Sequence, residues 1–138
     1  MVFESTKIIA KMLEQKEIRY DIVEQERSSA VYANFRVKNC NNLCVHFISA
    51  NDKNDVAVRI LSYITIPEEK RPEILEIINS LHMRYRFIRF VLTKNNQIIV
   101  EYDIPVSCVA LADVAYEMCV RFLDVADQGY VDFMKAIW

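Results

Sequence analysis

The chain has 138 residues and a formal net charge of −2, and 53% of its residues are hydrophobic against 26% that are charged. This length fits one domain that buries its own core, and charges interrupt every apolar run before it could span a membrane. The mild acidity excludes a protein that binds nucleic acid through its overall field, and a single glycine, Gly129, excludes most glycine-rich phosphate cradles.

The first half of the chain changes its hydrophobic period once. Apolar residues at helical spacing predict an N-terminal helix over residues 4–17, and alternation with period two predicts three consecutive antiparallel strands within residues 31–66. Asparagine-rich turns are expected at residues 39–42 and 51–55. The strands carry these alternating apolar positions: Val31, Ala33, Phe35, Val37, Leu43, Val45, Phe47, Val56, Val58 and Ile60.

The middle of the chain predicts a helix followed by a hairpin. Pro72 can occupy the first turn of a helix, where its missing N–H costs nothing. Residues 87–92 and 98–104 then flank an Asn-Asn pair that tolerates a tight turn. A two-residue turn would place Val91 opposite Val100 and Leu92 opposite Ile99.

The last part of the chain predicts a long apolar helix. Pro105 ends the final strand, and Ser107 can cap a helix that runs to about residue 126. Gly129 can supply a left-handed break, after which an aromatic stripe resumes helical spacing and is expected to dock. This stripe ends at Trp138.

These elements predict an α+β domain with a five-stranded antiparallel sheet packed against helices. The expected order is helix, three strands, helix, two strands and helix, and residues 1–138 are read as one domain because no repeat or linker interrupts them. The N-terminus lacks the features of a signal peptide, so we expect a cytoplasmic protein. The four cysteines are therefore expected to be free thiols.

Residues 64–79, 85–90 and 129–138 resemble the YbjN-like family, and the likeness extends over about residues 30–138. The family is similar in fold to the chaperones of type III secretion. The resemblance implies an antiparallel sheet packed against helices, often dimeric, in bacterial proteins labelled sensory transduction regulators. It implies no catalytic residues. The residues before 30 match least, and a surface specific to one partner could lie there.

One candidate for chemistry is Cys108. A thiol in the first turn after a Ser107 cap would feel the helix dipole, which lowers its affinity for a proton. This position supports an alternative function as a small thiol enzyme or redox protein. A metal site beginning with Cys40, Cys44 and His46 is not favoured, because no second close pair of ligands follows. We expect no cofactor and no metal.

A second candidate is the run from His82 to Phe90, which interleaves basic and aromatic residues as single-strand binding surfaces do. It supports a further alternative, a nucleic-acid binder through Arg84, Arg86 and Arg89, although a half-buried strand alternates in the same way. Glu101 and Asp103 share one face of their strand, and the expected hairpin register places Arg86 diagonally from Asp103.

The remaining signal is a surplus of large apolar side chains. Amphipathic aromatic residues suit interfaces because one end stays wet. The sequence therefore favours a non-enzymatic protein-binding module, a chaperone-like or regulatory adaptor that forms a homodimer and binds an unidentified protein partner. The candidate surface consists of Tyr32, Phe35, Tyr63, Tyr102 and Tyr116.

Overall fold

The computed structural model describes residues 1–50 and 55–138. The expected turn at residues 51–55 lies almost entirely outside this part of the chain. One antiparallel sheet of six strands, in the order β1-β2-β3-β4-β6-β5, carries the fold. In chain order the elements are α1 (Glu4–Gln15), β1 (Asp21–Glu24), β2 (Ser29–Arg36), β3 (Asn42–Ser49), β4 (Asp55–Thr65), η1 (Glu68–Lys70), α2 (Arg71–Arg84), β5 (Arg89–Leu92), β6 (Gln97–Pro105) and α3 (Leu111–Ile137).

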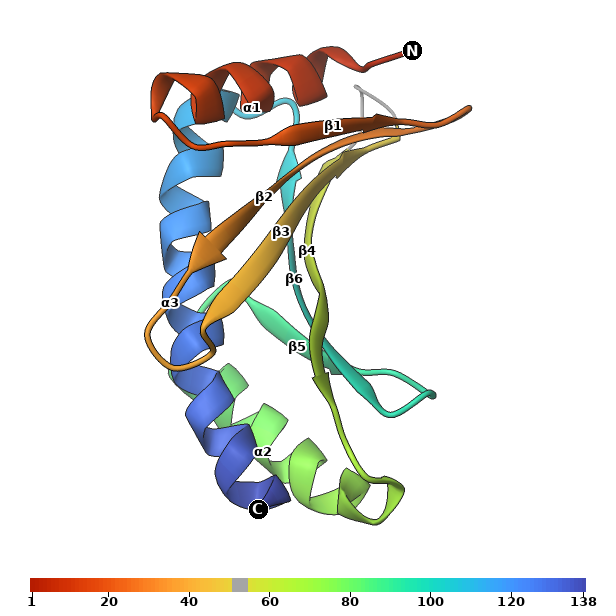
Figure 1. The fold of residues 1–138 in the computed structure, drawn as a ribbon, viewed down its shortest axis with the longest axis vertical. Coiled ribbons are helices and arrows are strands. Elements are labelled where there is room, and N and C mark those ends of the chain that lie inside the picture. Colours follow the sequence, from red (N-terminus) through yellow and green to blue (C-terminus); the bar gives the residue numbers. More distant parts are fainter. Residues whose placement is uncertain (51–54) are drawn as a thin grey trace.

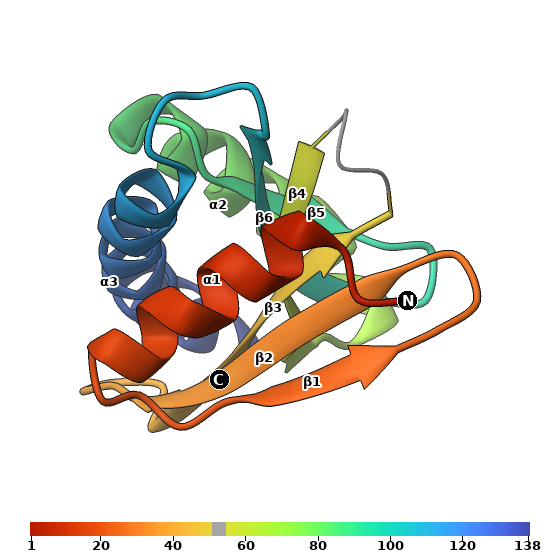
Figure 2. The same cartoon turned by 90° about the horizontal axis from the view of Figure 1, so that it is seen from above.

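The sheet is strongly curved, and the helices lie around its convex side (Figure 1). α1 lies over β2 at one end of the sheet, α2 lies at the other end, and α3 runs between them (Figures 1 and 2). The α+β class and the antiparallel sheet are confirmed.

The expectation of five strands was wrong, because β1 adds a sixth at the sheet edge. β1 pairs with β2 from Asp21 opposite Tyr32 to Glu24 opposite Ser29. Its four residues are all exposed, with Ile22 and Val23 as the apolar pair in the middle. Four residues with two adjacent apolar side chains give no alternating signal, so the sequence pattern missed this strand.

The core lies between the convex side of the sheet and the helices. Alternate strand residues point toward the helices and are buried, as in β3, where the pattern runs from Leu43 to Ser49. The largest fully buried side chains include Phe47 from the sheet and Phe122 and Phe133 from α3. Burial of this apolar surface is the main term that stabilises the fold.

Gly129 does not break the last helix. α3 continues without interruption from Leu111 to Ile137, so the predicted break was wrong. A Cβ atom at Gly129 would lie 2.9 Å from the Phe90 ring and 3.4 Å from Leu81. The glycine therefore serves close packing of α3 against β5 and α2 rather than a turn. The end of the stripe is also undocked, since Trp138 is 94% exposed.

Asp127 connects α3 to the turn between β2 and β3 through hydrogen bonds. Its carboxylate is buried and accepts the backbone N–H groups of Asn39 and Cys40, both at 2.8 Å. The Asn39 amide adds a contact at 3.3 Å, and Asn41 takes the left-handed φ of 76° that closes the turn. Two backbone donors on one carboxylate explain how a charged group is buried here.

The hairpin of β5 and β6 has a longer loop than the sequence predicted. The observed pairs are Val91 with Ile99 and Leu92 with Ile98, one residue away from the expected register. Thr93 N–H donates to Gln97, and Asn96 adopts a left-handed φ of 61°. These features define a three-residue loop with a left-handed last position, which the Asn-Asn pair fits as well as it fits a two-residue turn.

Candidate functional site

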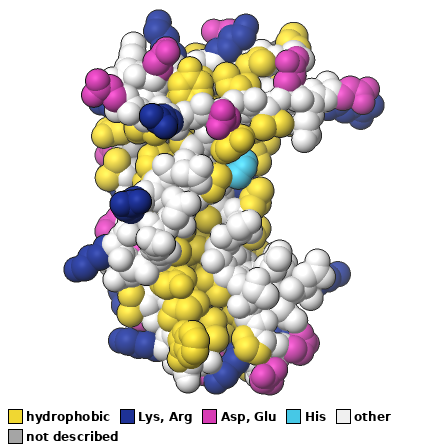
Figure 3. Space-filling view, viewed as in Figure 1, with side chains coloured by type: hydrophobic (Ala, Val, Ile, Leu, Met, Phe, Trp, Pro, Cys, Tyr) yellow, Lys and Arg dark blue, Asp and Glu magenta, His cyan; other side chains and the backbone are white. Residues whose placement is uncertain are grey.

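Among the described residues, no helix covers the concave side of the sheet, and this side opens opposite α3 (Figure 1). Strand alternation gives this face every second residue of each strand. The space-filling view shows that this side of the molecule is hollowed between two projecting ends, with hydrophobic side chains along the hollow (Figure 3). We define the concave face by the cross-strand register as Asp21, Val23, Ala30, Tyr32, Asn34, Cys44, His46, Ile48, Ala57, Arg59, Arg89, Val91, Ile99, Glu101 and Asp103.

Much of the concave face is apolar. Ala30, Ile48 and Ala57 follow one another across β2, β3 and β4, and Val23 extends this row to the edge. Val91 and Ile99 lie further along the face, where they are direct cross-strand partners. An antiparallel sheet with one solvated side usually alternates apolar inside with polar outside. The concave face departs from that pattern.

A network of charges crosses the middle of this face. The Arg59 side chain is 18% exposed and contacts Glu101 at 3.2 Å and Asp103 at 2.9 Å. Its guanidinium also donates to the Tyr102 carbonyl at 2.8 Å. Glu101, whose side chain is 13% exposed, binds Arg89 as well, at 2.6 Å. Two cations and two anions balance, so the network adds no net charge.

Tyr32 and His46 continue the same row toward β1. Their rings stack with centroids 5.1 Å apart, and His46 lies opposite Arg59 in the register. Partial burial lowers the pKa of His46 and so favours the neutral form of the ring. Next to it on the same strand, Cys44 Sγ lies 3.9 Å from His46 Nδ1. Partial burial raises the pKa of the Cys44 thiol.

The five residues of the candidate surface do not come together. Tyr32 belongs to the concave face, whereas Phe35 pairs with buried Leu43 and is half-buried on the helix side. Tyr116 lies on α3 with Lys16 over its ring. Tyr63 and Tyr102 are 9% and 3% exposed and pack against α3.

Tyr63 and Tyr102 differ in their hydroxyl partners. Tyr63 donates to the Ala126 carbonyl at 2.5 Å. The buried hydroxyl of Tyr102 has no hydrogen-bond partner among the described residues.

The basis for a reactive Cys108 was wrong. α3 begins at Leu111, so Cys108 lies in the turn before the helix rather than in its first turn, and Ser107 is not the cap. The residue before the helix is Ala110, with a left-handed φ of 59°. Among the other thiols, burial raises the pKa of Cys119 to about 12, and burial together with Asp127 raises that of Cys40 to about 11. Neither thiol is a nucleophile at neutral pH.

The three arginines of the basic run point to different places. Arg84 ends α2 and pairs with Asp132 at 2.7 Å, and Arg89 lies on β5 and pairs with Glu101. Arg86 lies between the two elements and does not reach Asp103, which contacts Arg59 and Arg89 instead. The predicted partner of Asp103 was therefore wrong. Arg84, Arg86 and Arg89 therefore do not lie on one strand.

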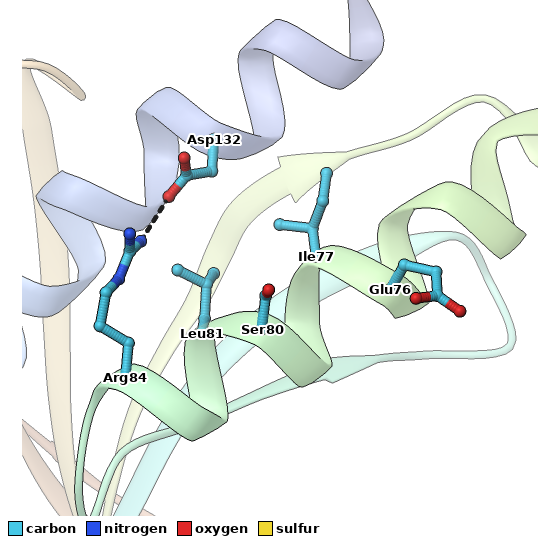
Figure 4. A pocket seen from close by; sticks show the side chains of 6 residues that line it. All are labelled: Glu76, Ile77, Ser80, Leu81, Arg84 and Asp132. Atoms are coloured by element: carbon cyan, nitrogen blue, oxygen red, sulfur yellow. Dashed lines mark hydrogen bonds and ion pairs between the residues drawn. The ribbon is translucent and has the colours of Figure 1, made fainter.

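A pocket of about 420 Å³ lies between α2 and α3. It is lined by Ile77 and Leu81, by Ser80 and Glu76, and by the ion pair of Arg84 with Asp132 (Figure 4). Figure 4 shows Glu76 at the far end of the pocket from this pair. Arg84 and Asp132 bind each other, and no histidine lines the pocket. This arrangement does not assemble a nucleophile with a base.

Arg59 and Glu101 are the site residues that sequence reasoning missed. Arg59 stands between apolar residues of a strand, and Glu101 was noted without this partner. Arg59 could have indicated this site from the sequence. A cation within an alternating strand needs either solvent or an acidic residue on the neighbouring strand.

The structure thus defines an α+β protein with one helix-covered and one open sheet face. Within residues 1–50 and 55–138, no group of three or more His, Cys, Asp or Glu side chains is placed to hold a metal ion. In the same residues, no helix has the length and hydropathy to cross a membrane.

A family model, YbjN, described as "Putative bacterial sensory transduction regulator", matches residues 5–134. The chain belongs to the YbjN family. The match includes α1, which the sequence resemblance did not cover. No curated protein matches the chain.

Proposed function

We propose that this protein is a non-enzymatic regulatory adaptor that binds a segment of another protein on its concave face. The observation that carries the proposal is the row of apolar side chains on a sheet face that no helix covers within residues 1–50 and 55–138. Contiguous apolar patches on a soluble protein mark interaction sites more often than chance positions do. The description of the YbjN family as a regulator supports the same role.

The shape and charges of the face support a polypeptide partner. A hollowed face accommodates a projecting segment, and the paired charges of Arg59, Glu101, Asp103 and Arg89 leave the centre of the face without net charge. Such a centre favours apolar and hydrogen-bonding contacts over strong ionic attraction. The likeness of the family to type III secretion chaperones, which bind segments of other proteins, supports this reading by analogy of fold. We place the adaptor in the cytoplasm.

Affinity capture from bacterial cells after mild crosslinking tests the proposal with matched variants. Ile48→Glu and Val23→Glu put a charge on the concave face, and Val23 is 41% exposed, so this change spares the core. Leu75→Glu on α2, at a position 51% exposed, is the control. We expect the wild type and Leu75→Glu to retain a stoichiometric protein that both concave-face variants lose. Equal retention by all four proteins contradicts the proposal.

We extend the proposal to a homodimer that leaves the concave face free. Its support is the apolar surface at the end of α3, where Met134 and Trp138 line a pocket of about 370 Å³ and Trp138 is 94% exposed. Sedimentation equilibrium is expected to give twice the chain mass for the wild type and a lower mass for Trp138→Ser. A wild-type protein that sediments as a monomer contradicts this part.

A further inference from the structure

We propose that Cys44 and His46 form a two-coordinate site for a soft monovalent metal ion, Cu(I), on the concave face. The two residues occupy alternate positions of β3, so both side chains stand on the same side of the sheet. Cys44 Sγ and His46 Nδ1 face each other at 3.9 Å, and both residues are half-buried.

The separation of the two donor atoms fits one ion between them. Metal–sulfur and metal–nitrogen bonds of about 2.3 Å and about 2.0 Å place these atoms about 3.5 Å apart at a tetrahedral angle and about 4.3 Å apart when linear. The observed 3.9 Å lies between these limits. An ion can therefore bind both atoms with little movement of the strand.

The donor set selects the kind of ion. A thiolate is a soft ligand, and thiolate with imidazole suits zinc or copper rather than magnesium or calcium. Zinc takes four ligands in structural sites and three in catalytic sites. No third His, Cys, Asp or Glu joins this pair within the described residues, and such a pair suits Cu(I), which accepts two ligands.

The groups around the pair leave the site accessible. Arg59, opposite His46, directs its guanidinium toward β6, where Glu101, Asp103 and the Tyr102 carbonyl bind it. Its charge is thereby offset. Tyr32 stacks on the His46 ring and helps to fix its orientation. Asn34, opposite Cys44, is exposed and carries no charge.

Binding exchanges one proton for the ion. The neutral imidazole offers a nitrogen lone pair, and the Cys44 thiol releases its proton to solvent as the sulfur–metal bond forms. Copper remains Cu(I), so no oxidant or reductant takes part. The site does not depend on the adaptor proposal, because the ion binds the isolated chain.

Anaerobic competition between the protein and a colorimetric Cu(I) chelator tests the site. We expect one high-affinity Cu(I) per chain, loss of this binding in Cys44→Ser, and at least a tenfold weaker affinity in His46→Gln. The matched controls Cys40→Ser and Cys108→Ser remove half-buried thiols elsewhere and are expected to bind as the wild type does. An affinity of His46→Gln within twofold of the wild type overturns the proposal, since Cu(I) would then sit on a thiol alone.

Nitrogen NMR of the histidine rings provides a second readout that does not depend on affinity. His82 is the internal control, because its Nε2 accepts the Phe90 N–H at 2.9 Å. We expect one equivalent of Cu(I) to shift the Nδ1 resonance of His46 and to leave His82 unchanged. A His46 ring that does not respond overturns the proposal even if the thiols bind copper.

Discussion

Phe47 and Ile48 are neighbours on β3, yet Phe47 is fully buried beneath the helices and Ile48 is half-buried on the concave face. The same contrast repeats along β2, β4 and β6, because alternate residues of a strand face opposite sides of the sheet. The helices of this chain cover the convex side of the sheet. The concave face also carries apolar rows, and among residues 1–50 and 55–138 no helix covers them. This difference is the reason for proposing a binding surface on the concave face.

The largest effect should come from the buried side of this contrast. Phe47→Ala removes a fully buried ring and is expected to lower the free energy of unfolding by about 4 kcal/mol. Ile48→Ala should cost less, about 1.5 kcal/mol, because Ile48 is only partly buried and its truncation leaves a site open to water rather than a closed cavity. Urea unfolding measures both. Equal losses of unfolding free energy would mean that the two sheet faces are equally packed, which contradicts the difference between them.

Asp127→Ala should give the next largest effect, because it releases the helix cover from the sheet. It leaves the Asn39 and Cys40 backbone N–H groups without their acceptor and is expected to cost about 3 kcal/mol. Asp124→Ala, one turn earlier on the exposed side of α3, is the control and should cost less than about 0.5 kcal/mol. Similar values for the two variants would show that the turn does not depend on this carboxylate.

Periodicity was sufficient to predict most of the fold. Alternation from Val31 to Ile60 predicted the three central strands, and Pro72 lies in the first turn of α2 as expected. The hairpin register could not be predicted, since the loop of Asn95 and Asn96 suits two lengths. The role of Gly129 depends on how closely Phe90 approaches it, which is a tertiary contact that no local pattern contains.

The candidate site was harder to predict than the fold. An apolar strand residue reads the same whether helices or solvent cover it, so the sequence showed a surplus of apolar surface without its location. The sequence could not distinguish the buried tyrosines Tyr63 and Tyr102 from Tyr32 on the concave face, because burial depends on the side of the sheet to which each side chain points. The prediction of a reactive Cys108 depended on where α3 begins. Tertiary contacts can move a helix boundary by a few residues, and here α3 begins at Leu111.

A smaller effect is expected in the charge network of the concave face. Glu101→Gln removes the acid shared by Arg59 and Arg89, and it should cost about 2 kcal/mol, because Arg59 and Glu101 are largely shielded from water. Glu117→Gln breaks the exposed pair with Arg121 and is the control, with an expected cost below about 0.5 kcal/mol. Chemical denaturation at low and high salt measures both. A cost that vanishes for Glu101→Gln in high salt would show that the network is a solvated surface feature.

The smallest expected effect is a dependence of stability on pH through His46. Its pKa is lowered from 6.5 in the folded protein, so the unfolded chain binds more protons as the pH falls below that value. The stability that the neutral His46 ring contributes is therefore fully present above pH 6.5 and decreases as the pH falls. Between pH 7.5 and pH 5.5, the wild type should therefore lose slightly more stability than His46→Gln, as urea unfolding at the two pH values measures. An identical pH profile for the two proteins would place His46 in full contact with water.

Photo-crosslinking in living cells tests the central claim most directly. A photoreactive amino acid replaces Ile48 on the concave face in one protein and the exposed Leu75 on α2 in another. The proposal predicts that position 48 crosslinks to one protein other than the chain itself and that position 75 does not. Crosslinks to such a partner from position 75 alone, or from neither position, would contradict a binding role for the concave face.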